Sequence, residues 1–174
     1  MKVIHIGVLK KVLLWRLVIM DLKAFSILEE LLYNLEKEDV ISELSNIDDP
    51  LVLHFFAANY NWDNGFDIPK ALLENENCDL GTGLLMFHYA DGYRMLENPE
   101  GVSSSTLEEW KDFSFYLYNR LENTEFKSQG VSFNPELTKI QKFKLKKSNP
   151  NIPDILMNKS RGDVVDIPKI EVEK

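Results

Sequence analysis

Apolar residues recur at helical spacing as far as Gly130, in short stretches that polar turns separate. From Asp21 they lie three or four positions apart, and glutamates occupy the opposite face. This spacing predicts a first amphipathic helix, with Asp21 as its N-cap. A shorter apolar pattern over residues 40–44 indicates a second helix. The apolar positions of the first helix are Phe25, Leu28, Leu31, Leu32 and Leu35.

Acidic residues followed by proline mark the starts of two further helices. In residues 48–50 (Asp-Asp-Pro) and 67–69 (Asp-Ile-Pro), carboxylates lie where helix N–H groups point, and proline stands where no N–H donor is needed. The first start predicts an almost wholly apolar helix over residues 51–60, which we expect at the centre of the fold. The second predicts a helix that continues beyond Pro69.

Capping patterns indicate two more helices. Asp79 is the expected N-cap of the fifth, and Thr106 with Glu109 forms a capping-box pattern ahead of the sixth. Ser105 with Glu108 is an alternative register for the same box. About six short helices joined by polar turns predict an all-α domain with helix-pair packing. No period recurs clearly enough to indicate a solenoid, although successive short helix pairs keep that architecture open.

The pattern changes after Gly130. Lysines crowd residues 139–147, and prolines at 135, 150 and 153 disfavour a compact helical layer. We therefore predict that residues 131–174 form a largely extended basic tail that wraps the helical body, with its lysines facing an acidic surface. A disordered tail is the alternative.

Charge divides the chain into three parts. Residues 1–20 carry a charge of +4, residues 21–138 hold 23 acidic and 7 basic side chains, and residues 139–174 carry +4. The acidic helical domain, which we place over residues 21–130, should repel phosphate backbones and attract basic proteins. We therefore expect a basic protein as partner and no direct nucleic-acid binding. A surface that only maintains solubility is the alternative.

The N-terminal segment is apolar and basic, but its pattern does not fit a membrane anchor. Arg16 interrupts residues 3–20, and a spanning helix needs ~20 predominantly apolar residues. A signal peptide would end in small residues, whereas Asp21 follows here. We interpret Met20 as the native start, so that residues 1–20 form an extension whose part upstream of Met20 is not native. A targeting role is the alternative, and we expect no membrane association.

Five side chains in the middle of the chain could carry chemistry. Histidines and carboxylates bind metal ions or act as general acids and bases, and a cysteine beside a helix start can be stabilised as a thiolate. No metal-binding motif joins these residues, so we favour structural roles and predict neither a metal nor a cofactor. The chain has a single cysteine, which fits a cytoplasmic location. The five candidates are His54, Asp63, Cys78, His88 and Asp91.

A polar loop with a tryptophan follows the central helix. A tryptophan in such a loop usually packs across helix ends, and the alternative is a residue that recognises a partner. If the loop has a direct function, we expect it to be display to a partner protein. The predicted binding residues are Trp62, Asp63, Asn64 and Asp67.

The same region carries a family signature. Residues 61–65 (Asn-Trp-Asp-Asn-Gly), 78–82 (Cys-Asp-Leu-Gly-Thr) and 90–93 (Ala-Asp-Gly-Tyr) resemble the signature of a bacterial family, the domain-of-unknown-function family four-two-seven-four. The resemblance covers about residues 50–95. It implies membership of a family but no activity, cofactor or site residue. Gly83 departs from the pattern, because a small helix former such as alanine is expected there.

These features lead to three functional hypotheses. The first is a non-enzymatic, acidic protein-binding protein, such as an immunity or neutralising partner of a basic toxin. The second is a small metal-dependent hydrolase that uses His54, His88, Asp63 and Asp91. The third is a helical scaffold module, in which stacked helix pairs would expose an apolar concave face.

Overall fold

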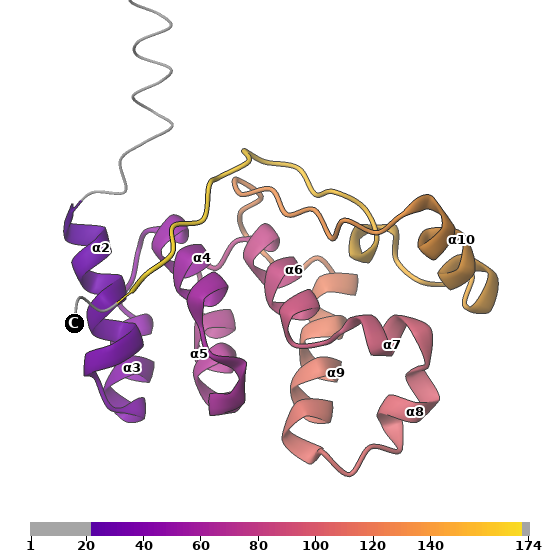
Figure 1. Ribbon diagram of the computed structural model, residues 1–174, viewed down its shortest axis with the longest axis horizontal. Coiled ribbons are helices and arrows are strands. Elements are labelled where there is room, and N and C mark those ends of the chain that lie inside the picture. Colours follow the sequence, from indigo (N-terminus) through magenta and orange to yellow (C-terminus); the bar gives the residue numbers. More distant parts are fainter. Residues whose placement is uncertain (1–21, 172–174) are drawn as a thin grey trace, which may run out of the picture.

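The computed structural model describes residues 22–171 (Figure 1). Within this range the chain forms nine α-helices, and its β-type contacts are two isolated parallel bridges. The predicted all-α class is confirmed. None of the helices in this range combines the length and the hydrophobicity that crossing a bilayer requires. Asp21, the expected cap of the first helix, and the extension over residues 1–20 lie outside the described residues.

The helices are short and closely spaced along the chain. In order, the elements are α2 (Leu22–Glu29), the π-helical turn η1 (Glu30–Asn34), α3 (Lys37–Leu44), α4 (Pro50–Asn59), the 3-10 turn η2 (Trp62–Asn64), α5 (Asp67–Glu74), α6 (Leu80–Tyr89), α7 (Tyr93–Glu97), α8 (Pro99–Ser103), α9 (Glu108–Glu122), α10 (Lys139–Ser148) and the 3-10 turn η3 (Asp154–Leu156).

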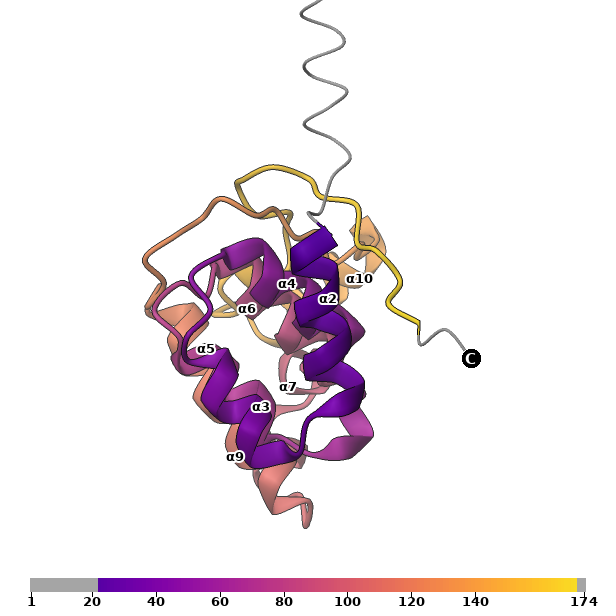
Figure 2. The same cartoon turned by 90° about the vertical axis from the view of Figure 1, so that its left-hand side faces the viewer.

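The helices from α2 to α6, together with α9, form two rows along the longest axis of the molecule. In one row α2 contacts α4 and α4 contacts α6, and in the other α3 packs on α5. Seen end on, α3, α5 and α9 lie to one side of α2, α4 and α6 (Figure 2). The guanidinium of Arg120 in α9 donates to the backbone carbonyl of Leu73 in α5 (2.6 Å), which joins α9 to the second row. The expected helix-pair packing is therefore present.

The two central helix pairs repeat at a constant offset along the chain. The bounds of α3 (37–44) and α5 (67–74) differ by the same amount as those of α4 (50–59) and α6 (80–89). The N-cap residues Asp49 and Asp79 keep this spacing, and each carboxylate accepts a hydrogen bond from the N–H two positions on, at 2.9 and 2.8 Å. The sequence hides the period because equivalent buried positions differ in size, as Leu53 and Gly83 do.

Helices α4 and α6 form the centre of the core. Phe56 in α4 and Phe87 in α6 are each only 1% exposed, and Leu53 and Leu85 are fully buried. Burying one large apolar side chain stabilises a fold by about 1.5–3 kcal/mol. The expected central position of the helix over residues 51–60 is confirmed.

The capping box predicted for the sixth helix is wrong in both registers. Helix α9 begins at Glu108, and Leu107 precedes it without a side-chain cap bond. The hydroxyl of Ser105 accepts a hydrogen bond from the Leu107 N–H (3.2 Å). Ser105 therefore closes a turn ahead of the helix, and Thr106 and Glu109 form no reciprocal pair.

Two short helices, α7 and α8, lie between α6 and α9 and were not evident in the hydrophobic pattern. Asn98 ends α7 and caps α8, because its side chain accepts a hydrogen bond from the Gly101 N–H (3.0 Å). Pro99 occupies the first position of α8, where no N–H donor is needed. Each of these helices has only five residues, too few for an apolar period to be recognised.

The basic C-terminal region is not wholly extended, because residues 139–148 form α10. A complete capping box starts this helix: Thr138 Oγ1 accepts from the Gln141 N–H (3.2 Å), and Gln141 Oε1 accepts from the Thr138 N–H (2.8 Å). Leu145 anchors the helix in the core and is 2% exposed. The tail is expected to be largely extended, and residues 139–148 depart from that expectation because the cap and the anchor stabilise a helix despite the lysine-rich composition.

The rest of the described tail is mainly extended and returns over the helical body toward α2 (Figure 1). Residues 130–133 run beside residues 160–163, with backbone hydrogen bonds from the Asp163 N–H to Gly130 O (2.8 Å) and from the Ser160 N–H to Phe133 O (2.9 Å). Two of its lysines form ion pairs within the tail, Lys146 with Asp154 at 3.1 Å and Lys169 with Glu171. For these lysines, the expected orientation toward the acidic body is wrong.

Candidate functional site

His54 lies inside the core and not in a cleft. It comes from α4, is 2% exposed, and its Nδ1 lies 3.0 Å from the hydroxyl oxygen of Thr82 in α6. Burial lowers the pKa of His54 from its ordinary 6.5 to about 4, because the charged form loses its hydration. The ring is therefore neutral at physiological pH and joins two central helices.

His88 connects α6 with the C-terminal tail. Its Nε2 donates to the backbone carbonyl of Leu156 (3.0 Å), and its ring stacks on Phe133 with the centroids 5.5 Å apart. Burial lowers the pKa of His88, and the hydrogen bond to Leu156 opposes this shift. Both histidines thus have partners that explain their presence structurally.

Cys78 is buried beside the start of α6 and is poorly suited to nucleophilic chemistry. Burial raises the pKa of its thiol to about 12, so the thiolate is disfavoured at neutral pH. An activated cysteine shows the opposite shift. Its Sγ lies 3.9 Å from the carbonyl oxygen of Asp79, in line with a packing role.

The two candidate carboxylates are exposed and lie on different turns. Asp91 follows α6 with a positive φ of 61° and forms an ion pair with Arg94 (3.6 Å). Asp63 lies in η2. No hydrogen bond, ion pair or ring contact within residues 22–171 joins any two of His54, His88, Asp63 and Asp91. That part of the chain contains no group of three or more His, Cys, Asp or Glu residues placed to hold a metal ion.

Trp62 packs among aromatic residues from the end of α4, the start of α5 and the first half of α9. Its ring centroid lies 5.6 Å from that of Tyr60, 6.3 Å from Phe66 and 6.2 Å from Phe113. The indole is half-buried, and its Nε1 has no hydrogen-bond partner among the described residues. Packing therefore accounts for this side chain, and a direct contact with a partner stays a prediction.

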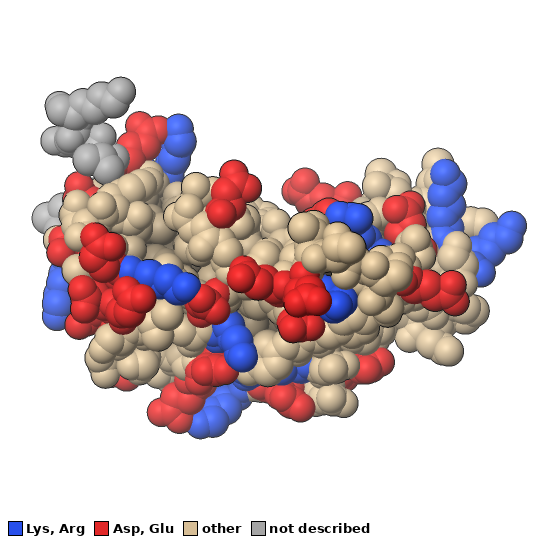
Figure 3. Space-filling model, turned by 90° about the horizontal axis from the view of Figure 1, so that it is seen from below, with Lys and Arg blue, Asp and Glu red and all other residues tan. Residues whose placement is uncertain are grey.

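The polar residues near Trp62 are exposed. Asp63 and Asn64 lie in η2, and Asp67 pairs with Lys37 at the start of α3. Asp67 is the first residue of α5 and not its cap, since Phe66 precedes the helix. Carboxylates are spread over much of the molecular face seen from below, with basic side chains between them (Figure 3).

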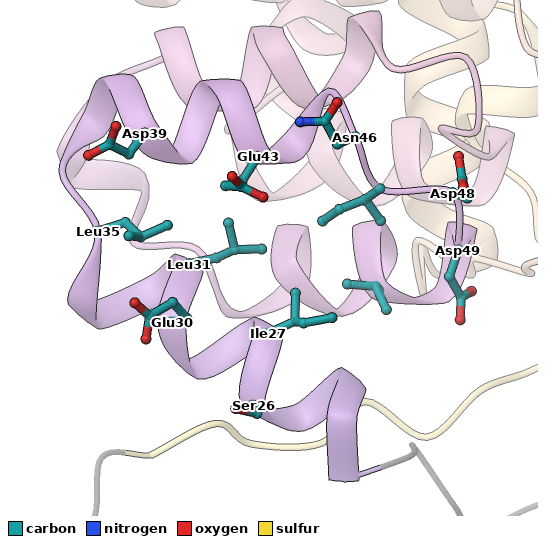
Figure 4. Close-up of a pocket in the computed structure, with 12 residues that line it drawn as sticks. Ser26, Ile27, Glu30, Leu31, Leu35, Asp39, Glu43, Asn46, Asp48 and Asp49 are labelled. Carbon is teal, nitrogen blue, oxygen red and sulfur yellow. The ribbon is translucent and has the colours of Figure 1, made fainter.

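A groove lies between α2, η1, α3 and the loop that leads to α4 (Figure 4). Its volume is about 700 Å³, within the roughly 300–1,000 Å³ that is typical of ligand clefts. Its apolar floor consists of Ile27, Leu31, Leu35, Ile47 and Val52, and its acidic rim of Glu30, Asp39, Glu43, Asp48 and Asp49.

The lining of this acidic groove contains five carboxylates and no lysine or arginine. Asp39 and Glu43 lie one turn apart on α3, and all five rim carboxylates are exposed. Sequence reasoning missed the groove, because it named only the loop after α4 as a binding region. The available signals were the i, i+4 pair on α3 and the acidic turn over residues 48–49, but only the fold places α2 and η1 across the groove from them.

Comparisons with known proteins agree with the family resemblance. Residues 48–122 match the family model described as Domain of unknown function (DUF4274). This match extends beyond the signature region and includes α4 to α9, whereas most of the acidic groove and all of α10 lie outside it. No curated protein and no solved structure matches the chain.

Proposed function

We propose that this chain, which carries a DUF4274 domain over residues 48–122, is a non-enzymatic protein-binding module that captures a basic partner protein in the acidic groove. The single observation that carries this proposal is the combination of an apolar floor with five rim carboxylates in one groove of about 700 Å³.

The two parts of the groove support binding in different ways. Half-buried side chains such as Ile27 and Ile47 offer apolar area that a partner can cover, and this area supplies affinity. The rim carboxylates raise the rate of encounter with a basic surface and exclude acidic partners. Direct binding of nucleic acid is disfavoured, because phosphate groups would meet the same carboxylates.

An immunity or neutralising protein that binds a basic toxin is the role we place first. The charge of −16 over residues 21–138 favours rapid capture of a basic protein. We propose the cytoplasm as the setting, which fits the single buried thiol of Cys78.

The helix stack supports a scaffold role as the second candidate. Helix pairs that recur at a constant offset resemble the short repeats of solenoid proteins, which use their surfaces for binding. The hydrolase alternative has less support, since His54 and His88 each interact with other parts of the fold and Asp63 and Asp91 are exposed on separate turns.

A matched pair of double variants tests the groove. Asp39→Asn with Glu43→Gln removes two rim charges, and Glu97→Gln with Asp112→Asn removes two exposed charges elsewhere. The wild-type chain and each variant are used to capture proteins from native cells, and a captured partner is then purified and titrated at rising salt.

We expect a basic partner that binds the wild-type chain and the control alike. The groove variant should bind at least about tenfold more weakly, which corresponds to about 1.4 kcal/mol. The wild-type affinity should fall as salt rises. Equal binding by both variants, or an affinity that salt does not change, would overturn the proposal.

A further inference from the structure

Helix α10 exposes a face that is both apolar and basic. Ile140 and Phe143 are each 69% exposed, although large apolar side chains are normally covered. Lys144 and Lys147 are exposed and follow at the spacing that places all four residues on one side of the helix. We name Ile140, Phe143, Lys144 and Lys147 the α10 face.

The opposite side of α10 is already used within the chain. Leu145 is buried, and the ammonium group of Lys146 donates to the carbonyl of Ile152 (2.6 Å). Lys142 donates to the side-chain oxygen of Asn158 (2.8 Å). Fold stability therefore accounts for these residues but not for the exposure of Phe143 and Ile140.

The α10 face and the acidic groove lie at opposite ends of the molecule. Along the longest axis, α2 and α3 form one end and α10 the other (Figure 1). In this arrangement α10 cannot reach the groove of its own chain. A second copy can present it.

We propose that the α10 face of one copy docks in the acidic groove of another copy. The apolar side chains of Ile140 and Phe143 cover the groove floor, and the lysines pair with rim carboxylates such as Asp39 and Glu43. The two surfaces are similar in length, because α10 has ten residues, about 15 Å, and the groove-lining stretch from Ser26 in α2 to Leu35, the residue after η1, also has ten.

This contact joins unlike surfaces, so it has a definite consequence for assembly. A pair of copies joined in this way keeps a free groove at one end and a free α10 face at the other, so that further copies can add to give head-to-tail chains or a closed ring. The inference rests on the proposed function only in that the same groove binds protein. A basic partner and a second copy would then compete for one site.

Charge reversal on each surface tests the contact in the full chain. One variant carries Asp39→Lys with Glu43→Lys in the groove, and the other carries Lys144→Glu with Lys147→Glu on α10. Sedimentation velocity at low salt measures the self-association of each variant over a wide range of concentration. Circular dichroism verifies that each variant is folded, and Lys159→Glu with Arg161→Glu, exposed residues outside the α10 face, is the control.

We expect the wild-type chain and the control to self-associate more strongly at higher concentration and lower salt. Each reversed variant alone should associate at least about tenfold more weakly. A mixture of the two should recover association, since a basic groove then meets an acidic α10 face and an acidic groove meets a basic one. This recovery distinguishes a specific contact from general charge repulsion.

Three results would overturn the inference. They are a monomeric wild-type chain at all concentrations, association that Phe143→Asp leaves unchanged, and binding of the α10 face to anionic vesicles or DNA without self-association. The proposed function is judged separately. Phe143→Asp changes only the α10 face, so this variant should still capture a basic partner. The effect of the groove variant on capture of that partner tests the proposed function, and self-association of the Phe143→Asp variant tests the contact between copies.

Discussion

The carboxylate of Asp79 accepts a hydrogen bond from the backbone N–H of Val131, 3.2 Å away and 52 residues further along the chain. The same carboxylate accepts from the Gly81 N–H (2.8 Å), the Ser128 hydroxyl (2.7 Å) and the Gly130 N–H (2.6 Å). One buried side chain therefore caps α6 and fixes the start of the tail.

Replacing Asp79 by Asn should destabilise the protein by about 2–4 kcal/mol. An amide NH₂ would face donors on Ser128 and Gly130, and buried donors without acceptors are costly. Denaturant unfolding measures the loss. The control is Asp49→Asn, where the cap is exposed and accepts from Leu51, and its cost should stay below about 1 kcal/mol. An equal loss in the free energy of unfolding for Asp79→Asn and Asp49→Asn would contradict the role of Asp79 in holding the tail.

Replacing Gly81 by Ala should also weaken the attachment of the tail. A Cβ at position 81 would lie 2.1 Å from the backbone oxygen of Val131, so the backbone must move. We expect a loss of about 2 kcal/mol in the free energy of unfolding. Gly130→Ala is the matched control, because a Cβ there meets its nearest atom at 3.6 Å. If Gly81→Ala is as stable as this control, the close approach is not rigid.

Stability should decrease as pH falls from about 6.5 to about 4, in part because of His54. In this window the unfolded chain binds a proton at His54 and the folded chain does not, since burial lowers the folded pKa to about 4. Over the whole window, this difference in pKa lowers the free energy of unfolding by about 3 kcal/mol. Unfolding of wild type and His54→Asn at a series of pH values isolates this contribution from that of the other titratable groups. Parallel pH profiles would contradict it.

Replacing Asn59 by Ala should free the end of the tail from α4. The Asn59 amide donates to Pro168 O (3.0 Å), and its oxygen accepts from the Ile170 N–H (3.2 Å). We expect a loss of about 1–2 kcal/mol and faster hydrogen exchange at the Ile170 amide. Asn64→Ala, at an exposed position in η2, should leave that amide protected. Unchanged exchange in Asn59→Ala would show that burial of Ile170 alone holds the segment.

Local signals in the sequence predicted local structure well. The cap and proline at residues 49–50 predicted the start of α4, and the apolar run after them predicted its burial. These predictions hold because a cap residue interacts only with the first turn of the helix that it starts.

The helices α7, α8 and α10 were missed. Their short lengths or lysine-rich composition hide the apolar period, and the starts of α8 and α10 depend on single side chains, Asn98 and Thr138.

The candidate site was predicted less well, because its residues come together only through packing. The chemistry proposed for His54 and His88 depended on shared surroundings, but the fold places one against Thr82 and the other against Leu156. Trp62 stood out in the sequence, yet its aromatic neighbours include Phe113 from α9. The spacing of residues along the chain does not reveal a contact such as that of Trp62 with Phe113, whose residues are far apart in the sequence.

The sequence by itself determined the all-α class, the acidic character of the body and the resemblance to a family, because periodicity, charge and motif are properties of residue order. Only the tertiary structure decided that α2 and α3 enclose an acidic groove, that α10 presents Phe143 at the far end, and that Asp79 holds the tail. Each of these features depends on how the elements are arranged in space, and packing of the whole core selects that arrangement.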